Sequence, residues 1–205
     1  MYKRQDSSSL CKRTSKKFGI IFNSLYLYDE EYFNSAIKLF SIDNDLTIVA
    51  IAEASAAEEA ELQIGDKVIA INYEPVPIDK GEFLAFYRDI ENIIGDYDVV
   101  PLTIIRRGEN DTIETFEVDI IPDDVCDYDV LLGQSDNVNA YADGSNIIIE
   151  KGMMRFARTD EELGLVIGHE LAHNVMGHLD KRFNNRLAGT FLDVLAAGYL
   201  SLIHI

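Results

Sequence analysis

The sequence predicts an α+β fold in which strands dominate the first part of the chain and helices the last. Three observations predict it. Short runs rich in β-branched residues recur between turn residues. A long segment with helical spacing interrupts them, and a capped helix begins near residue 160. Because strands and helices are largely segregated along the chain, we expect an α+β arrangement rather than a regular alternation.

The predicted strands are runs of Val, Ile and Leu bounded by turn residues. Gly65-Asp66 forms a turn before the second strand. Gly108–Asp111 forms the loop of a hairpin between the third and fourth strands. The strands are predicted at residues 46–52, 68–72, 99–107, 112–121 and 146–150.

Helices are predicted where apolar residues recur three or four positions apart. Lys80–Ile94 has this spacing, and Asp29–Phe40 could form a shorter helix with one apolar face. Ala54–Leu62 is rich in alanine and glutamate and is predicted to be a short helix or turn. Pro122–Asp129 is acidic and irregular, so we expect it to link two domains.

The helix that begins near residue 160 carries the main chemical signal. Thr159 is the predicted N-cap and Glu162 completes a capping box. His169 and His173 are four residues apart, so their rings lie on one helix face and can bind a single zinc ion. Glu170, beside them, could take a proton from a zinc-bound water and pass it to a leaving amine. This pattern is the zincin signature of metal-assisted peptide hydrolysis.

The residues around the motif favour a buried helix over the alternative, an ordinary amphipathic helix with surface histidines. An apolar run, 163–167, leads directly into the motif. His178 lies out of phase with the two ligands, so we expect it at the helix end or facing solvent. A zinc site needs a third protein ligand. Asp180 is too close to the motif, and nothing around Asp193 supports that role.

Charge and cysteine content exclude some functions. The formal net charge of −18 opposes binding to nucleic acid or to anionic lipid heads. The first 17 residues are basic, so this segment is a charged leader or touches a membrane surface. Cys11 and Cys126 are too few for a disulfide framework and lack the spacing of metal ligands. No apolar run reaches the length of a transmembrane helix.

Both ends of the chain have an unusual sequence. Met1–Gln5 and Leu200–Ile205 resemble translated sequencing-adapter read-through. We therefore expect both to be artefacts and the chain to be a fragment of a longer protein.

Residues 41–121 resemble a PDZ domain. The resemblance rests on Ala60–Asn72, which contains the run Leu-Gln-Ile-Gly-Asp-Lys-Val-Ile-Ala-Ile-Asn, and on Ile104–Gly108, which is similar to the final hairpin of the family. A carboxylate-binding loop, with a glycine between apolar residues, is not visible near Ile42–Leu46. The resemblance implies a β-rich domain that binds extended peptide at a sheet edge, or one that spaces or gates a protease.

Residues 131–182 resemble the HtpX and CaaX-prenyl-protease family of zinc metallopeptidases. Two linked motifs carry this resemblance: Val166–His173, and the upstream segment Asn139–Gly144 with the strand and Gly152-Met153-Met154 that follow it. It implies the N-terminal part of an α+β zincin domain. The implied ligands of one Zn²⁺ are His169, His173 and a Glu missing from the chain, with Glu170 as general base. The implied substrate cleft edge is formed by Asn139, Ala140, Tyr141 and Ala142.

The sequence thus predicts an unassigned segment at 1–40, a PDZ-like domain at 41–121 and a partial metallopeptidase domain at 122–205. The predicted function is a zinc-dependent metalloendopeptidase that acts through a zinc-activated water on protein or peptide substrates, with no nucleic-acid partner. One alternative is a PDZ-type interaction protein with an incomplete or inactive protease half. Another is a closed structural zinc site. By family analogy, the location is extracytoplasmic or membrane-associated in a bacterium.

Overall fold

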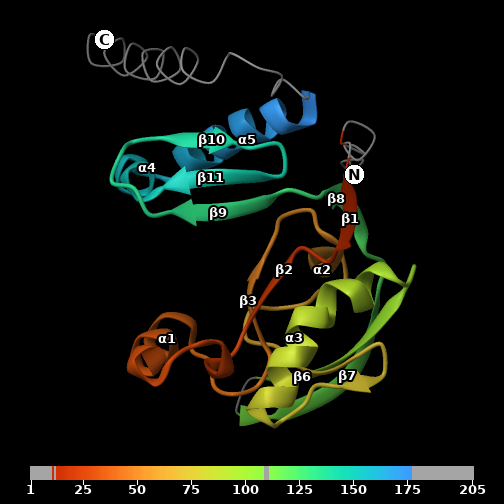
Figure 1. The fold of residues 1–205 in the computed structure, drawn as a ribbon. Coiled ribbons are helices and arrows are strands. Elements are labelled where there is room, and N and C mark those ends of the chain that lie inside the picture. Colours follow the sequence, from red (N-terminus) through yellow and green to blue (C-terminus); the bar gives the residue numbers. More distant parts are fainter. Residues whose placement is uncertain (1–10, 12, 109–110, 177–205) are drawn as a thin grey trace, which may run out of the picture. The chain divides into compact units, whose positions relative to one another are not determined.

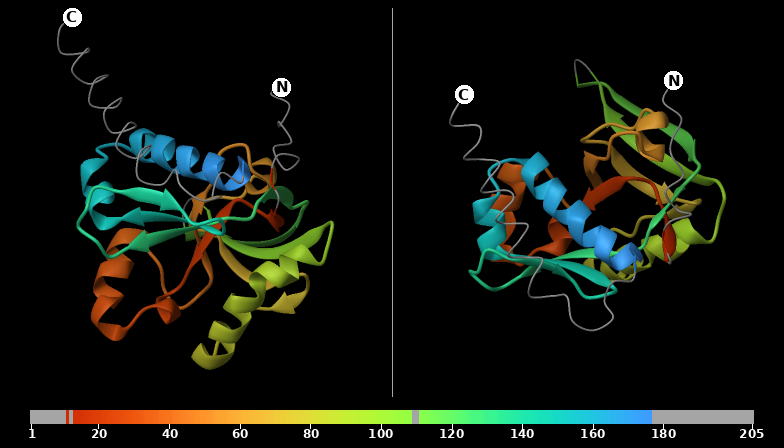
Figure 2. Two further views of the ribbon diagram at one scale, coloured as in Figure 1. Left: turned by 45° about the horizontal axis from the view of Figure 1, so that its top comes forward. Right: turned by 90° about the horizontal axis from the view of Figure 1, so that it is seen from above.

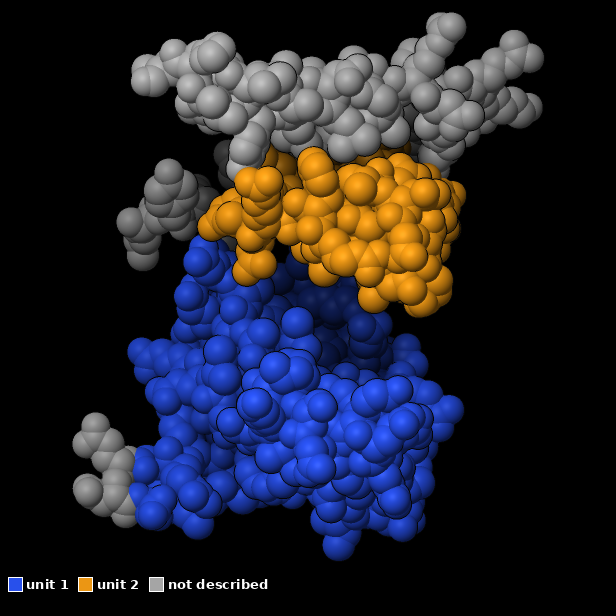
Figure 3. All heavy atoms as spheres, turned by 90° about the vertical axis from the view of Figure 1, so that its left-hand side faces the viewer, with its two compact units in different colours: residues 1–8, 14–125 blue, residues 9–13, 126–205 orange. Residues whose placement is uncertain are grey.

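The computed structural model describes residues 11, 13–108 and 111–176 and confirms the α+β class. The chain divides into two compact units, coloured separately in Figure 3. Unit 1 contains residues 14–125, and unit 2 contains residues 126–205 together with residues 9–13. Residues 1–8 are also grouped with unit 1 but lie outside the described part.

Unit 1 is built on a six-stranded sheet with the strand order β2-β3-β4-β6-β7, in which β5 also pairs with β4. All the pairings in this sheet are antiparallel. The longest pairing is the predicted hairpin of β6 and β7, in register from Val100↔Ile120 to Arg107↔Ile113. The strands are β2 (Ile20–Asn23), β3 (Thr47–Ile51), β4 (Lys67–Ile71), β5 (Glu74–Pro75), β6 (Val100–Arg107) and β7 (Ile113–Ile120).

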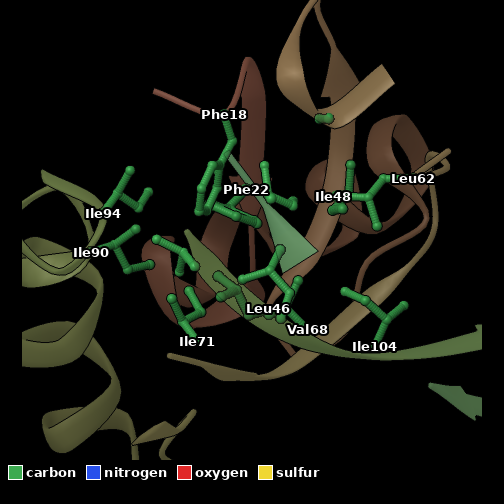
Figure 4. Close-up of a cluster of buried hydrophobic side chains, with 14 of the residues drawn as sticks. Phe18, Phe22, Leu46, Ile48, Leu62, Val68, Ile71, Ile90, Ile94 and Ile104 are labelled. Carbon is green, nitrogen blue, oxygen red and sulfur yellow. The ribbon is translucent and has the colours of Figure 1, made fainter. Parts of the chain in front are cut away.

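The helix α3 (Lys80–Gly95) covers the core of unit 1. Asp79 is its N-cap, because its side chain accepts hydrogen bonds from the backbone N–H groups of Gly81 and Glu82. Phe83 is fully buried against the strands, and Ile90 and Ile94 join the same cluster (Figure 4). The predicted helix at 80–94 is therefore confirmed. Shorter elements are η2 (Leu25–Leu27), η3 (Glu30–Tyr32), α1 (Phe33–Phe40) and α2 (Ala56–Glu59).

The unassigned N-terminal segment contributes a strand to the sheet. β2 pairs with β3 and is preceded by Gly19, which lies between Phe18 and Ile20 and has φ +76°. A Cβ at Gly19 would lie 2.2 Å from the Cβ of Ser55, so only glycine allows this close approach. Gly19 is thus a glycine between apolar residues that directly precedes β2. It lies well upstream of Ile42–Leu46, where no such pattern is visible in the sequence.

The segment 122–129 is not irregular, so that part of the prediction is wrong, although the boundary between the two units, after Val125, falls within this segment. It contains β8 (Asp123–Cys126), which pairs with β1 (Thr14–Lys17) in a two-stranded sheet. The backbone N–H of Ala56 donates to Oδ2 of Asp123, at 2.8 Å. One of the acidic residues that suggested a loop, Asp123, is therefore used as a hydrogen-bond acceptor within unit 1.

Unit 2 is a three-stranded sheet with a helix on one face, and α5 runs alongside β10 and β11 (Figure 2). β10 pairs antiparallel with β11, and β11 pairs parallel with β9. Its small core joins Ala140, Ile147 and Ile149 of the sheet to Met153 and Val166 of the helices. The elements are β9 (Asp129–Gly133), β10 (Ala140–Ala142), β11 (Asn146–Glu150), α4 (Lys151–Phe156) and α5 (Asp160–Met176).

Several sequence predictions lie outside the described residues. These are the predicted place of His178, the third-ligand candidates Asp180 and Asp193, and the two terminal segments expected to be artefacts. Within the described part, no helix combines the length and apolar character that crossing a membrane requires.

Candidate metal and catalytic site

The motif lies on α5, whose first turn is fixed by local hydrogen bonds. Oγ1 of Thr159 accepts from the backbone N–H of Glu162 at 3.3 Å, as the predicted cap requires. The Glu162 side chain accepts at 2.8 Å from the backbone N–H of Arg158, one residue before the predicted N-cap. Acidic residues fill the first turn, where they complement the positive end of the helix dipole.

The rings of His169 and His173 meet on one face of α5. Their Nε2 atoms are 3.1 Å apart, and the ring planes are nearly perpendicular, at 85°. Both side chains are partly buried. Two nitrogen ligands at about 2.0–2.1 Å from a tetrahedral zinc ion lie roughly 3.3 Å apart, so the pair has the separation that one zinc ion requires.

The described residues supply only part of a complete coordination shell. Among residues 11, 13–108 and 111–176, no group of three or more His, Cys, Asp or Glu side chains is placed to hold a metal ion. The donor set of two imidazole nitrogens nevertheless fits zinc by chemistry and by spacing.

Glu170 points from α5 to the strand β10. Its Oε2 accepts a hydrogen bond from the backbone N–H of Ala142 at 3.1 Å. Burial raises the pKa of the Glu170 carboxyl above its ordinary value, although the nearby His169 ring and the Ala142 N–H group partly oppose the rise. The hydrogen bond therefore holds one oxygen of the carboxylate in a fixed position at β10.

The predicted cleft-edge segment forms the outer strand of the three-stranded sheet. Asn139 and Asp143 bond to β11, because Glu150 N–H donates to Asn139 O and Asp143 N–H donates to Asn146 O. Alternate residues of an antiparallel strand direct their backbone groups to opposite sides. Ala140 and Ala142 therefore direct theirs to the outer edge, where Glu170 accepts from Ala142. Tyr141 lies between them and is exposed.

Sequence reasoning missed one residue that the structure places beside these groups. Asn174, which follows His173 directly, is only 3% exposed. Its Oδ1 accepts from the backbone N–H of Gly144 at 2.8 Å, and its Nδ2 donates to the carbonyl of Asn146 at 3.0 Å. A signal was present in the sequence, because Asn174 follows Glu170 by four positions and so shares its helix face.

The two cysteines are also brought together. Cys11 and Cys126 form a disulfide with a Cα–Cα distance of 5.5 Å. Next to it, the Arg13 side chain donates to Oδ2 of Asp127 at 3.0 Å and lies over the ring of Tyr128. These contacts hold Cys11 and Arg13 against the beginning of unit 2.

Comparison with known families identifies the region that contains the motif. Residues 118–202 match the model of peptidase family M48. This match supports a metallopeptidase, and it covers the sheet and both helices of unit 2. No curated protein matches the chain.

The solved structures similar to this chain include PDZ domains. The PDZ domain of HtrA3, bound to a phage-derived ligand, has 16% identity and a TM-score of 0.37 and covers 55% of this chain and 89% of its own. A PDZ domain protein from Parabacteroides distasonis has 18% identity and a TM-score of 0.37, and the match covers 56% of this chain and 21% of that protein. The PDZ domain of a carboxy-terminal protease from Vibrio cholerae, in complex with peptide, has 14% identity and a TM-score of 0.34. This match covers 55% of this chain and 98% of that domain.

Proposed function

We propose that this protein is a zinc-dependent metalloendopeptidase whose unit 2 carries the catalytic helix. The observation that carries the proposal is the 3.1 Å separation of the His169 and His173 Nε2 atoms, on a helix within the region matched to family M48. His169 and His173 would hold the zinc ion, with further ligation from outside the described residues. When bound, zinc would supply Lewis-acid polarisation of a water molecule and of the substrate carbonyl.

Glu170 is the proposed general base. Its carboxylate takes the proton from the attacking water and returns it to the leaving amine. The hydrogen bond from Ala142 N–H supports this role, because it fixes one carboxylate oxygen while the other remains available. Partial burial of the carboxylate also supports the role, since burial makes its proton affinity higher than in water.

The outer edge of β10 is the proposed place for the substrate backbone. Ala140 directs its N–H and C=O groups to this edge, and Ala142 adds its C=O group, since its N–H group is donated to Glu170; an extended peptide could therefore add to the sheet as a further strand. Because Glu170 accepts from the same edge, a peptide paired there would lie next to the carboxylate.

A second role is proposed for unit 1, which would bind an extended peptide segment at β2. β2 is the end strand of the sheet, and Gly19 O accepts from Ala52 N–H on the β3 side. By alternation, Ile20 and Phe22 direct their backbone groups outward, and the hydroxyl of Tyr87 on α3 already donates to Phe22 O. This edge supports a PDZ-like binding or gating role for the unit.

An extracytoplasmic location is proposed on the basis of the disulfide. A structural disulfide is favoured in oxidising compartments and rare in the cytosol of mesophiles. This location agrees with the one that the family resemblance implies.

Peptide hydrolysis by the zinc-loaded protein tests the proposed function. We expect cleavage that a chelator abolishes and added zinc restores. Glu170→Gln should retain zinc, because Glu170 is not one of the proposed ligands, but should lose cleavage by several orders of magnitude, because an amide cannot take the proton. Hydrolysis by this variant at the wild-type rate would refute the role of Glu170. Peptide binding without any hydrolysis would favour an interaction protein instead.

A further inference from the structure

Asn174 is a buried polar side chain on α5 that bonds to the backbone at two points outside its own helix. Its amide oxygen accepts from Gly144 N–H, at 2.8 Å, and its amide nitrogen donates to Asn146 O, at 3.0 Å. Gly144 lies in the tight turn that joins β10 to β11, and Asn146 is the first residue of β11. One side chain therefore attaches this hairpin to the helix.

The turn itself requires these partners. Gly144 has φ +97°, and Oδ1 of Asp143 accepts from the N–H groups of Ser145 and Asn146, at 2.8 and 2.7 Å. That arrangement uses the Ser145 and Asn146 donors but leaves the Gly144 N–H group to be satisfied by Asn174. Among the short side chains, only asparagine offers a donor and an acceptor on one planar group.

The helix positions relate this attachment to the candidate catalytic groups. Glu170 and Asn174 are four residues apart on one face, and each bonds to the β10–β11 hairpin. His169 and His173 are likewise four apart, one position earlier, so they occupy the neighbouring face. The hairpin is therefore attached to α5 at two points, by the hydrogen bond between Ala142 and Glu170 and, one helical turn further along, by the contact of Asn174 with Gly144.

We infer that Asn174 is a positioning residue that holds the outer edge of β10 against α5, so that Ala142 N–H stays in place at the Glu170 carboxylate. The catalytic consequence rests on the proposed function, whereas the structural coupling does not. Asn174 acts through the hairpin, and its hydrogen bonds to Gly144 and Asn146 involve neither histidine of the motif. Its loss should therefore lower the turnover number and leave zinc affinity unchanged.

Amide hydrogen exchange in the metal-free 205-residue chain tests the coupling. In Asn174→Ala, we expect exchange at Ala142 to accelerate about tenfold or more, because an anchoring buried hydrogen bond is lost. Exchange at Val166, in the middle of α5, should change less than about twofold. Asn146→Ala is the matched control, because it removes a side-chain hydrogen bond within the turn, to Asp143, but keeps the carbonyl that Asn174 contacts.

Two outcomes would overturn the inference. One is unchanged exchange at Ala142 in a folded Asn174→Ala variant, and the other is an equal acceleration in Asn146→Ala. If exchange at Val166 accelerates as much as exchange at Ala142, the Asn174→Ala variant is unfolding globally. The experiment is then repeated with Asn174→Asp. This isosteric change keeps the acceptor for Gly144 but removes the donor to Asn146 O, and the same criteria apply to it.

Kinetics of the zinc-loaded protein separate the inference from the proposed function. A fall in kcat with unchanged KM and unchanged zinc affinity in the Asn174 variants supports the positioning role. A weakened zinc affinity would contradict it. If the wild-type protein hydrolyses no peptide, the proposed function fails, whereas the exchange experiment still decides the coupling between Asn174 and Ala142.

Discussion

The carboxylate of Glu170 accepts a hydrogen bond from the backbone N–H of Ala142, 28 residues earlier in the chain, at 3.1 Å. This contact joins the helix that carries both histidines to the outer strand of its sheet. A proposed base is thereby fixed at the same edge at which a peptide could add to the sheet.

Replacing Ala142 by proline removes the donor of this contact. A hydrogen bond to a charged group contributes about 1.5–3 kcal/mol, so we expect kcat to fall roughly tenfold to a hundredfold with zinc affinity unchanged. Proline is tolerated on an edge strand where its nitrogen points away from the sheet. Steady-state kinetics check this, with Ala140→Pro as the control, which should raise KM more than it lowers kcat. Equal kcat in Ala142→Pro and wild type would contradict the role of the contact.

Removal of either histidine should abolish metal-dependent stabilisation. A ligand that binds only the folded state at about a hundredfold over its Kd stabilises by about 2.7 kcal/mol. We expect zinc to raise the Tm of the wild type and not that of His169→Ala or His173→Ala. His178→Ala serves as the control, because sequence spacing places it out of phase with the pair. A zinc-induced Tm shift that persists in both ligand variants would exclude this site.

The ion pair of Asp66 and Arg106 should dominate the electrostatic stability of unit 1. Asp66 is 1% exposed and accepts two 2.7 Å hydrogen bonds from the Arg106 guanidinium, as well as one from Gln63 N–H. Breaking a buried pair by removing one partner costs about 3–5 kcal/mol. Because Arg106 is partly exposed, we expect Asp66→Ala to lower the free energy of unfolding by about 3 kcal/mol in urea denaturation.

The matched control for this prediction is the exposed pair of Arg107 and Asp111. Their side chains are 75% and 87% exposed and their charged atoms are 3.5 Å apart. Exposed pairs contribute about 0–1 kcal/mol, so Arg107→Ala should change stability very little. Similar losses of unfolding free energy in Asp66→Ala and Arg107→Ala would show that burial does not decide how much these ion pairs stabilise the protein.

The Cys11–Cys126 disulfide should stabilise the oxidised protein strongly. It closes a loop with a sequence separation of 115 residues, for which the chain-entropy model gives an upper value of about 4–5 kcal/mol. We expect no free thiol in protein isolated under oxidising conditions, and a marked fall in Tm when a reductant is added. The double variant Cys11→Ser, Cys126→Ser should have a Tm below that of the oxidised wild type, and reductant should leave it unchanged. Two titratable thiols in wild-type protein isolated under the same conditions would contradict the pairing.

The hairpin of unit 2 should lose stability in acid. The hydrogen bond from the Asn146 side chain, together with those from the Ser145 and Asn146 N–H groups, holds the pKa of the Asp143 carboxyl below its ordinary value. A lowered pKa in the folded state means that this stabilisation is complete above the unfolded pKa, near about 4, and is lost as the pH falls through the folded pKa. In Tm measurements from about pH 5 to about pH 2.5, Asp143→Asn should show a shallower decline than the wild type. Identical slopes of Tm against pH in the two proteins would show that Asp143 does not contribute to the loss of stability in acid.

The elements predicted correctly are those with a strong local signal. β6 and β7 alternate over eight residues each, and α3 has apolar residues at helical spacing over its 16 residues. The strands that were missed, β1, β2, β5, β8, β9 and β10, have two to five residues each. A short edge strand has too few residues to show a period, so its pairing is decided by tertiary contacts.

The candidate site could likewise be predicted only where the signal is local. The spacing of His169 and His173 is enough to place both rings on one face, because an α-helix fixes the relation between positions four apart. The contacts of Glu170 with Ala142 and of Asn174 with Gly144 span 28 and 30 residues. They depend on how the hairpin packs on α5, which helical spacing does not specify.

The position of the disulfide has a consequence for proteolytic damage. Cys11 and Cys126 flank residues 14–125, which form the described part of unit 1, so this unit lies inside a covalently closed ring. A single cut within the ring, including a self-inflicted one, leaves both pieces on one molecule. The cut would be visible on a denaturing gel only after reduction, so a nicked chain would keep both pieces together for as long as its surroundings stay oxidising.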